Sequence, residues 1–267
     1  MKYVRRELEA PLRKVVKTFP ATVLTGPRRA GKTSLLRHLF PKAAYFLLED
    51  PDIVARLRAD PQGFLDALLA TRHGQILNKT ELATPLGVSV PTISQWLGVL
   101  EATAQILIVA PFYENLGKRL IKSPKVYLAD SGLACHLLRI DSASELAKSP
   151  FAGVLFEGFI AAEIVKAQVN AGRRRELYHF RDGQGLEVDF VVPGRGGSLS
   201  LVECKAGKTV MPAMAAPMQR LADALRTKRG AGTGVDMCLV HQGPTDRVHS
   251  VAPGVRALSW REFVEHL

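Results

Sequence analysis

Leu199-Ser-Leu-Val-Glu-Cys-Lys205 is the stretch that decides the fold of the C-terminal half of this 267-residue chain. Its apolar residues predict a buried strand, and the period of two along a strand puts Glu203 and Lys205 on one face. Val202 and Cys204 face the other way. Charges at the end of a buried strand are costly unless they are paired or bound to a metal. The sequence therefore predicts that both charged residues have a structural partner or a chemical role.

A second acid interrupts the preceding apolar run, where Asp189 lies within Glu187-Val-Asp-Phe-Val-Val192. An aspartate followed about fourteen residues later by Glu-x-Lys is the arrangement that restriction-type nucleases use. Two carboxylates hold Mg²⁺ or Mn²⁺ against the scissile phosphate, and the lysine positions or activates the attacking water. Glu157, on the preceding predicted helix, is the expected third acid. The predicted catalytic residues are Glu157, Asp189, Glu203 and Lys205, with Asp189 and Glu203 as metal ligands.

A purely structural interpretation of the same residues stays open. Asp189 or Glu203 could form an ion pair with Lys205 in a fold that no longer cleaves anything. The acid Glu163, on the same predicted helix as Glu157, shares a more polar side with Lys166 and is not expected at the site.

The periodicity around these strands predicts an α/β domain over residues 139–267 with a restriction-endonuclease-like core. A linker with one short helix is expected over residues 139–152. After it we expect a helix, three strands, a helix and a strand, over residues 153–170, 177–181, 187–192, 199–205, 211–226 and 237–241.

The segment before this domain predicts a winged helix-turn-helix over residues 73–138. Gly87 suits the turn between two helices, Ser89 is the expected N-cap of the second helix, and Pro91 suits its first turn. Ile106–Val109 and Lys125–Leu128 are expected to form the two strands of the wing.

Whether this winged helix contacts DNA stays open at the level of sequence. The positions expected to be exposed on its second helix carry no lysine or arginine; they are Thr92, Ser94, Gln95 and Glu101. Such a surface is poorly equipped for phosphate or guanine contacts. The expected cations lie in the connection between the wing strands, at Lys118, Arg119, Lys122 and Lys125. A structural or protein-docking role is the alternative.

Near the N-terminus, Gly26-Pro-Arg-Arg-Ala-Gly-Lys-Thr33 has the pattern of a phosphate-binding P-loop. It follows a short apolar run and precedes a helix-like stretch, so backbone N–H groups and the helix N-terminus can surround phosphate oxygens. We expect ATP and Mg²⁺ as ligands, with Lys32 on the phosphates and Thr33 on the metal. The predicted nucleotide-binding residues are Gly26, Arg29, Gly31, Lys32, Thr33 and Ser34.

Composition fits a globular protein with ample core, and its charge suits either a polyanionic ligand, such as a nucleotide or nucleic acid, or an ordinary soluble surface with an excess of lysine and arginine. The formal net charge is +11, of which residues 1–72 contribute 14 − 7 = +7, so the basicity is concentrated around the P-loop. Three scattered cysteines without metal-ligand spacing suggest a reduced, cytoplasmic setting. No apolar run approaches the ~18 residues that would span a bilayer, so no membrane association is expected.

Three stretches together carry a resemblance to a known family. They are Leu24–Ser34 around the P-loop, Asn115–Leu133 with Lys125-Val-Tyr-Leu-Ala-Asp130, and the group Phe156-Glu-Gly-Phe159, Glu187-Val-Asp-Phe190 and Glu203-Cys-Lys205. Nearly the whole chain resembles bacterial and archaeal ATPases of the AAA superfamily that end in a domain of unknown function with a restriction-endonuclease-like core. The resemblance implies that Gly26, Gly31, Lys32 and Thr33 bind ATP and Mg²⁺.

The chain departs from that family after the P-loop. The resemblance implies a Walker B strand ending in Asp-Glu, a sensor strand and a helical lid, whereas here Asp60–Leu69 runs almost directly into Thr71–Leu77. Roughly a hundred residues of an intact nucleotide domain are missing, which makes residues 1–72 a truncated P-loop segment. An internal deletion is the simplest account, and we expect ATP hydrolysis to be impaired.

Three functional hypotheses follow from the sequence. The first is a nucleic-acid-associated ATP-binding protein with a nuclease-like C-terminal domain and little ATP hydrolysis. The second is a Mg²⁺- or Mn²⁺-dependent nuclease with a vestigial P-loop. The third is a non-catalytic winged-helix module that binds DNA or protein. The sequence does not predict an oligomeric state.

Overall fold

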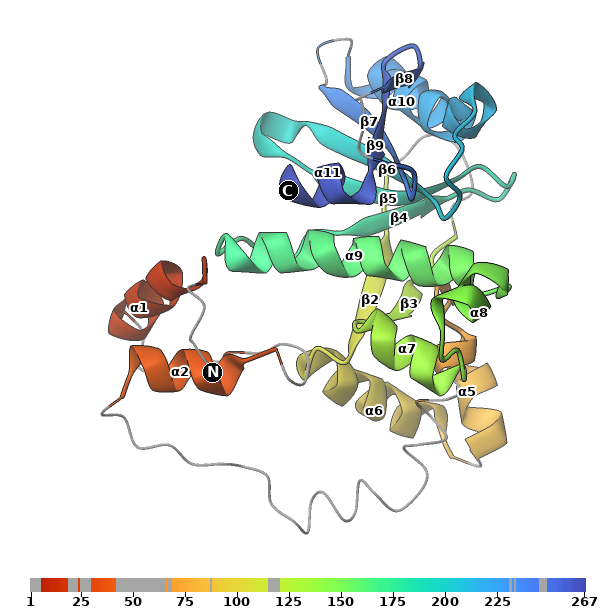
Figure 1. Cartoon of the computed structure of the whole chain (residues 1–267). Coiled ribbons are helices and arrows are strands. Elements are labelled where there is room, and N and C mark those ends of the chain that lie inside the picture. The colour runs from red at the N-terminus through yellow and green to blue at the C-terminus, as the bar shows by residue number, and fades with distance from the viewer. Residues whose placement is uncertain are drawn as a thin grey trace.

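The computed structural model describes residues 6–18, 24, 30–41, 66, 69–86, 88–114, 121–230, 232, 234–244 and 249–267. Within these residues the chain has a mixed α/β fold built on one nine-stranded sheet (Figure 1). The strand order is β1-β3-β2-β4-β5-β6-β7-β9-β8. The mixed α/β class predicted from the sequence is therefore confirmed.

The C-terminal part of the sheet combines an antiparallel meander with parallel strands. Strands β4, β5 and β6 are antiparallel neighbours, whereas β6, β7 and β9 run parallel. Their bounds are β4 Tyr178–Arg181, β5 Glu187–Pro193, β6 Leu199–Lys205, β7 Val235–His241, β8 His249–Ala252 and β9 Val255–Ser259. Because β6 and β7 are parallel neighbours, a crossover connection must join them, and the helix between these two strands supplies it.

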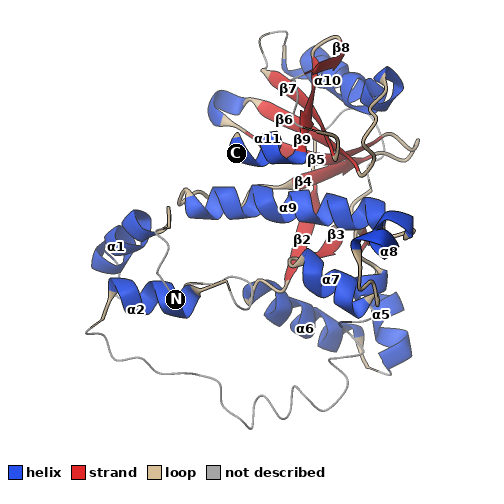
Figure 2. Cartoon of the chain, in the orientation of Figure 1, coloured by secondary structure: helices blue, strands red, loops and turns tan. Residues whose placement is uncertain are grey.

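Helices cover both faces of this part of the sheet (Figure 2). The long helix α9 (Ala152–Asn170) and the short α11 (Trp260–Glu265) share one core with Val202 and Cys204. On the other face, η2 (Pro212–Ala215) and α10 (Ala216–Arg229) pack in a core that contains Leu199 and Leu201. The alternation predicted along Leu199–Lys205 is confirmed, because its apolar side chains divide between the two cores.

The preceding segment packs helices against the other end of the same sheet. Its elements are β1 (Gln75–Ile76), α5 (Lys79–Leu86), α6 (Val90–Ala102), β2 (Ile106–Pro111), β3 (Lys125–Leu128), α7 (Ser131–Leu137) and α8 (Ala143–Lys148). Helix α6 begins as predicted, because the Ser89 side chain accepts a hydrogen bond from the N–H of Thr92 at 3.2 Å and Pro91 lies in the first turn. Strands β2 and β3 form the predicted antiparallel pair.

The sheet runs without interruption across the boundary predicted near residue 138. Strand β2 pairs in parallel with β4, through Ala110 with Tyr178 and Pro111 with His179. Helix α9 contributes Leu155 to the core around α5 and α6 and Ile160 to the core beneath the C-terminal strands. The two predicted modules therefore share a sheet and a helix.

Helices α1 (Glu9–Thr18) and α2 (Lys32–Leu39) form a small separate core around Leu12, Leu35 and Leu39. Helix α2 is the helix predicted after the P-loop. The run Tyr45-Phe-Leu-Leu-Glu-Asp50 predicts a further strand and Pro51 the start of a short helix, but these residues lie outside the described part of the chain.

Among the α-helices and strands of the described residues, the sequence analysis did not predict α1, β1, α7, β8, β9 and α11. Helix α7 is only seven residues long and begins where the Asp130 side chain accepts a hydrogen bond from the N–H of Leu133 at 2.8 Å. Helix α11 carries a capping box between Ser259 and Glu262. The sequences of α7 and α11 contain these capping residues, but each helix is too short to show helical periodicity.

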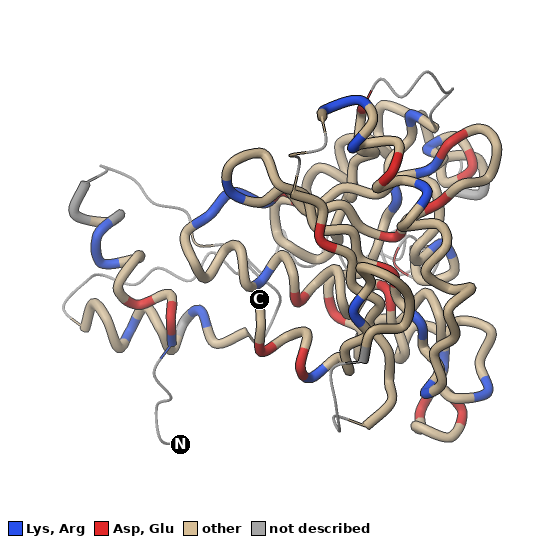
Figure 3. Tube along the Cα trace, turned by 90° about the horizontal axis from the view of Figure 1, so that it is seen from above, with Lys and Arg blue, Asp and Glu red and all other residues tan. Residues whose placement is uncertain are grey.

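Charges of both signs are interspersed along the described chain (Figure 3). Among the described residues, we find no helix with the length and apolar character that crossing a membrane requires.

Gly158 on α9 lets this helix approach a buried histidine. A Cβ atom at Gly158 would lie 2.1 Å from Nε2 of His73, whose side chain accepts a hydrogen bond at Nδ1 from the N–H of Leu128. His73 is 1% exposed, and burial lowers its pKa to about 4. The close approach therefore fixes α9 against the segment that carries β3.

We expect Gly158→Ala to destabilise the protein by about 1–3 kcal/mol, because the added methyl group forces His73 or the helix to move. Gly153→Ala, on the same helix, is the matched control, since a Cβ there meets nothing within 4 Å. The control should be neutral or stabilising by about 0.5–1 kcal/mol. Urea denaturation of both variants measures the difference, and equal stabilities would contradict the packing described.

Candidate functional site

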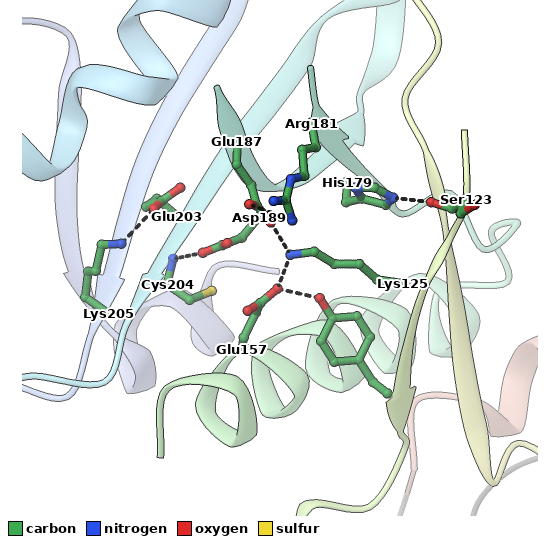
Figure 4. Close-up of polar contacts among 11 residues, drawn as sticks. Ser123, Lys125, Glu157, His179, Arg181, Glu187, Asp189, Glu203, Cys204 and Lys205 are labelled. Carbon is green, nitrogen blue, oxygen red and sulfur yellow. Dashed lines mark hydrogen bonds and ion pairs between the residues drawn. The ribbon is translucent and has the colours of Figure 1, made fainter. Parts of the chain in front are cut away.

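Lys125 lies at the centre of a cluster of charged side chains (Figure 4). It is the first residue of β3, and it is 3% exposed. Its Nζ is 2.9 Å from Oε1 of Glu157 and 2.8 Å from Oε1 of Glu187. The prediction that Lys125 belongs to the exposed cations of the wing is therefore wrong. The carboxylates of α9 and β5 draw it inward, because a buried ammonium needs anionic partners.

Glu157 has two partners on β3. Besides Lys125, the hydroxyl of Tyr127 donates a hydrogen bond to the same Oε1 atom. Tyr127 is fully buried, and burial together with the neighbouring charge of Glu157 raises its pKa well above the ordinary value. Glu157, the third predicted acid, is 8% exposed, and its carboxylate is held by side chains of β3.

Asp189 lies at an irregularity of β5. The register between β4 and β5 shifts between the pairs Tyr178–Val191 and Phe180–Val188, so β5 contains one extra residue there. Such bulges redirect side chains, and Oδ2 of Asp189 accepts a hydrogen bond from the N–H of Cys204 at 2.8 Å. The hydrogen bond ties Asp189 to the strand that carries Glu203.

Glu203 and Lys205 form an ion pair along one face of β6, with Oε1 and Nζ 2.7 Å apart. This is one of the two ion pairs that the structural interpretation of the sequence allowed. Glu203 is 6% exposed, and its Oε2 atom accepts no hydrogen bond from the described residues. Lys205 is about one third exposed, so its ammonium group lies between Glu203 and solvent.

The electrostatics of the cluster oppose full ionisation of its acids. Burial raises the pKa of Asp189 well above its ordinary range, and the charges of Glu157 and Glu203 raise it further. Burial also raises the pKa of Glu203, although Lys205 and the nearby N–H of Asp189 offset part of the rise. Carboxyl groups that repel one another in this way are typical of sites that bind a cation.

The basic groups are held in their charged forms. Burial alone lowers the pKa of Lys125, but the charges of Glu157, Asp189 and Glu187 outweigh it and raise the pKa. The same holds for Lys205, where burial is outweighed by the hydrogen bond and charge of Glu203. Both lysines are therefore cations near neutral pH.

His179 borders this cluster without a hydrogen bond to any of its acids. The side chain is fully buried, and its Nε2 lies 3.2 Å from the carbonyl oxygen of Ser123. Burial and the charge of Lys125 lower its pKa to about 4. His179 is therefore neutral near pH 7.

The structure brings all four predicted catalytic residues into one region, from α9, β5 and β6. Sequence reasoning missed Lys125, Tyr127 and Glu187 as members of the cluster. A signal was present, since the period of two puts Lys125 and Tyr127 on one face of β3 and Glu187 and Asp189 on one face of β5. What the sequence could not give is the pairing of β2 with β4, which brings the two segments into one sheet.

The donor set at Asp189 and Glu203 fits a hard divalent cation. Carboxylate oxygens are the ligands that Mg²⁺ and Mn²⁺ prefer, and Mg²⁺ often takes only one or two carboxylates and completes its shell with water. The described residues contain no group of three or more His, Cys, Asp or Glu side chains suited to hold a metal ion. A metal here would therefore use Asp189 and Glu203, and Oε2 of Glu203 has no hydrogen-bond partner in the part of the chain that the structure describes.

The predicted nucleotide-binding residues are only partly described. Gly31 has a φ of 73°, in the left-handed region that favours glycine, and α2 begins at the next residue, Lys32. Arg6 donates a hydrogen bond to the carbonyl oxygen of Ala30 at 2.5 Å. Ser34 is exposed, whereas Gly26, Arg29 and the side chain of Thr33 lie outside the described part of the chain.

The expected DNA-contacting surface is also only partly described. Gln95 is exposed on α6, Ser94 accepts a hydrogen bond from Nζ of Lys79 at 3.1 Å, and Glu101 pairs with Arg175 at 2.6 Å. Lys122 is exposed, and Lys118 and Arg119 are outside the described residues.

Family models of domains of unknown function match most of the described chain. One family model, a domain of unknown function (DUF8612), matches residues 61–144. A second, also a domain of unknown function (DUF4143), matches residues 152–255 and so spans α9 and the strands that carry Asp189 and Glu203.

Two curated relatives are mycobacterial. The uncharacterized proteins Mb2031c of Mycobacterium bovis and Rv2008c of Mycobacterium tuberculosis are each 34% identical to this chain over 125 residues. The aligned region is 47% of this chain and 27% of each relative, so the chain spans about a quarter of the length of the relatives it matches. What the comparisons establish is a stretch that matches the DUF4143 domain and a similarity to these mycobacterial proteins.

Proposed function

We propose that Asp189 and Glu203 hold one Mg²⁺ or Mn²⁺ ion and that the chain is a metal-dependent nuclease acting on nucleic-acid phosphodiesters. The observation that supports this most directly is Oε2 of Glu203, a buried carboxylate oxygen without a hydrogen-bond donor among the described residues. Such an atom is destabilising unless a cation or donor reaches it. Its neighbours Asp189 and Lys205 are the residue types that the restriction-type arrangement requires.

The residues of the site have separate roles in this proposal. A bound divalent cation would neutralise charge on a phosphate and make water a better nucleophile. The hydrogen bond from the N–H of Cys204 orients Asp189, and the ion pair with Lys205 orients Glu203. Because the pKa of Lys205 is raised by its hydrogen bond to Glu203 despite partial burial, the lysine stays protonated. Lys205 therefore donates to a phosphate oxygen or to water and does not act as the base.

We expect the purified chain to cleave plasmid DNA in the presence of Mn²⁺ or Mg²⁺. Asp189→Ala and Lys205→Ala should each lower the cleavage rate by about 100-fold or more, in line with the loss of a metal ligand or of a donor at the reacting phosphate. Lys208→Ala, an exposed lysine just beyond β6, is the control and should cleave like the wild type. Cleavage that persists unchanged in both site variants would come from a contaminant and would overturn the proposal.

A second candidate is ATP binding at the P-loop, as the resemblance to AAA-superfamily ATPases implies. Gly31 has a left-handed backbone conformation, and α2 begins at the next residue. This geometry supports ATP binding, because it presents backbone N–H groups to a phosphate. Arg6, beside Ala30, adds a positive charge at the same helix terminus. In this proposal the P-loop binds Mg²⁺-ATP with little hydrolysis.

For this candidate we expect micromolar binding of Mg²⁺-ATP in isothermal titration calorimetry, lost in Lys32→Ala. Arg37→Ala, an exposed residue on the same helix, should bind like the wild type. Turnover should be low in both proteins. Robust turnover that depends on Lys32 would show that hydrolysis survives the shortened segment, whereas no binding would make the segment a remnant.

A further inference from the structure

Lys125 brings a positive charge from β3 into a cluster otherwise formed by α9, β5 and β6. Nucleases with two metal ions hold them about 3.5–4 Å apart between shared carboxylates. The acids that would complete such a second ion site here are Glu157 and Glu187, next to Asp189. We infer that Lys125 is a built-in cation that takes the place of a second divalent ion and limits the site to one metal. This inference rests on the proposed function, because the first ion is the one assigned to Asp189 and Glu203.

The geometry around Nζ is that of a bound cation. The ammonium group lies within 2.9 Å of two carboxylates from two different elements, and the side chain of Lys125 is 4% exposed. One of these carboxylates, Glu157, also accepts the Tyr127 hydroxyl at the same oxygen. Glu157 is thereby committed to β3 and acts as a positioning residue for Lys125, not as a metal ligand.

The lysine is fixed by its strand as well as by its charge. Strand β3 lies inside the sheet between β1 and β2, and Lys125 pairs with Ile76 on one side and Val109 on the other. An ammonium held in this way cannot exchange with solvent ions, in contrast to a metal. The segment that includes α5 and α6 thus contributes a residue to the site on the C-terminal strands.

The charge balance of the cluster agrees with a single metal. With all four acids ionised, as ligands of a metal must be, four carboxylates face three cations among the described residues, which gives 3 − 4 = −1. The acids are Glu157, Glu187, Asp189 and Glu203, and the cations are Lys125, Arg181 and Lys205. One divalent ion already exceeds this deficit, so a second would be repelled. Without Lys125 the balance is 2 − 4 = −2, so one divalent ion leaves the cluster neutral and not positive. Glu157 and Glu187 also lose a cationic partner and become available to a second ion.

The test is the number of Mn²⁺ ions bound per chain, measured on the full chain by isothermal titration calorimetry and checked by electron paramagnetic resonance. Lys125→Met keeps most of the side-chain volume and removes the charge. We expect one ion for the wild type and two for Lys125→Met. The double variant Lys125→Met with Glu157→Gln should return to one ion, because the second site loses a carboxylate. Lys122→Met, an exposed lysine three residues earlier, should behave like the wild type.

The outcomes separate this inference from the proposed function. One ion in both the wild type and Lys125→Met, with equal affinity, would overturn the role of Lys125 and leave the proposed metal site intact. No ion in the wild type but one in Lys125→Met would support the displacement of metal by Lys125 and overturn the proposed function. No ion in either protein would overturn both.

A Lys125→Met variant that does not fold without metal still tests the inference. If Lys125→Met is unfolded without metal, circular dichroism during a Mn²⁺ titration reports whether the ion restores the fold. Refolding at saturating Mn²⁺ would support the inference, since the metal then replaces the missing cation. A variant that stays unfolded at saturating Mn²⁺ would contradict it.

Discussion

Glu157→Ala should destabilise the protein by about 3 kcal/mol, because removing one partner of a buried ion pair leaves the other uncompensated. Among the described residues, Lys125 would keep only Glu187 as an ion-pair partner, and the buried Tyr127 hydroxyl would lose its acceptor. The expected loss is at the lower end of the range for buried pairs, since Glu187 remains. For a chain of this size it corresponds to a fall in Tm of roughly 10 °C.

The matched control is Glu163→Ala, on the same helix. Its carboxylate pairs with Lys166 at 2.7 Å, but Lys166 is about half exposed, so we expect a change within about 1 kcal/mol. Urea denaturation with a two-state fit measures both variants. Similar losses for Glu157→Ala and Glu163→Ala would mean that the interaction of Glu157 with β3 is not formed in solution.

Asp189→Asn should have the opposite effect and stabilise the metal-free protein by about 1–2 kcal/mol near pH 7, as substitutions that relieve strain at functional sites commonly do. The amide keeps an oxygen that can accept the hydrogen bond from Cys204 and removes a charge repelled by Glu157 and Glu203. The same substitution should abolish binding of Mn²⁺, because a carboxylate ligand is lost. Stability and metal binding therefore change in opposite directions.

The pH dependence of this stabilisation follows from the raised pKa of Asp189. Below the ordinary pKa of about 3.9, the carboxyl is protonated in both the folded and unfolded states, so its ionisation does not lower the stability of the wild type relative to the variant. As the pH rises, the unfolded chain loses its proton first, so the stability of the wild type falls until the pH passes the raised pKa. The advantage of Asp189→Asn should thus be small near pH 4 and larger near pH 7.

Thermal unfolding across this pH range measures the effect. Asp223→Asn, at an exposed acid next to Arg226, is the control and should change stability by less than about 0.5 kcal/mol at any pH. A destabilised Asp189→Asn variant would show that the charge of Asp189 is compensated in the metal-free protein, against the electrostatics described above.

The sequence predicted most of the elements that carry the site. The alternation in Leu199–Lys205 and the apolar run around Asp189 gave β6 and β5 nearly to the residue, and the periodicity after residue 152 gave α9. These stretches are long enough for a period of two or 3.6 to be recognised. The short elements α7 and α11 were missed because six or seven residues show no clear period.

The membership of the site was only half predictable. Asp189, Glu203 and Lys205 follow from local spacing, since two adjacent strands bring them together. Lys125 does not, because its environment depends on β2 pairing with β4, a contact between residues nearly 70 positions apart such as Ala110 and Tyr178. From the sequence, a single lysine at the start of a strand is expected to be exposed. Only the long-range pairing of β2 with β4 buries Lys125.

The measurement that tests the central claim most directly is the binding of Mn²⁺ to the wild-type chain, compared with Asp189→Asn and Glu203→Gln. The account predicts one ion per chain for the wild type and none for either variant, with folded proteins in all three cases by circular dichroism. Binding that is absent from the wild type, or that persists unchanged in both variants, would contradict a divalent-cation site at these two carboxylates.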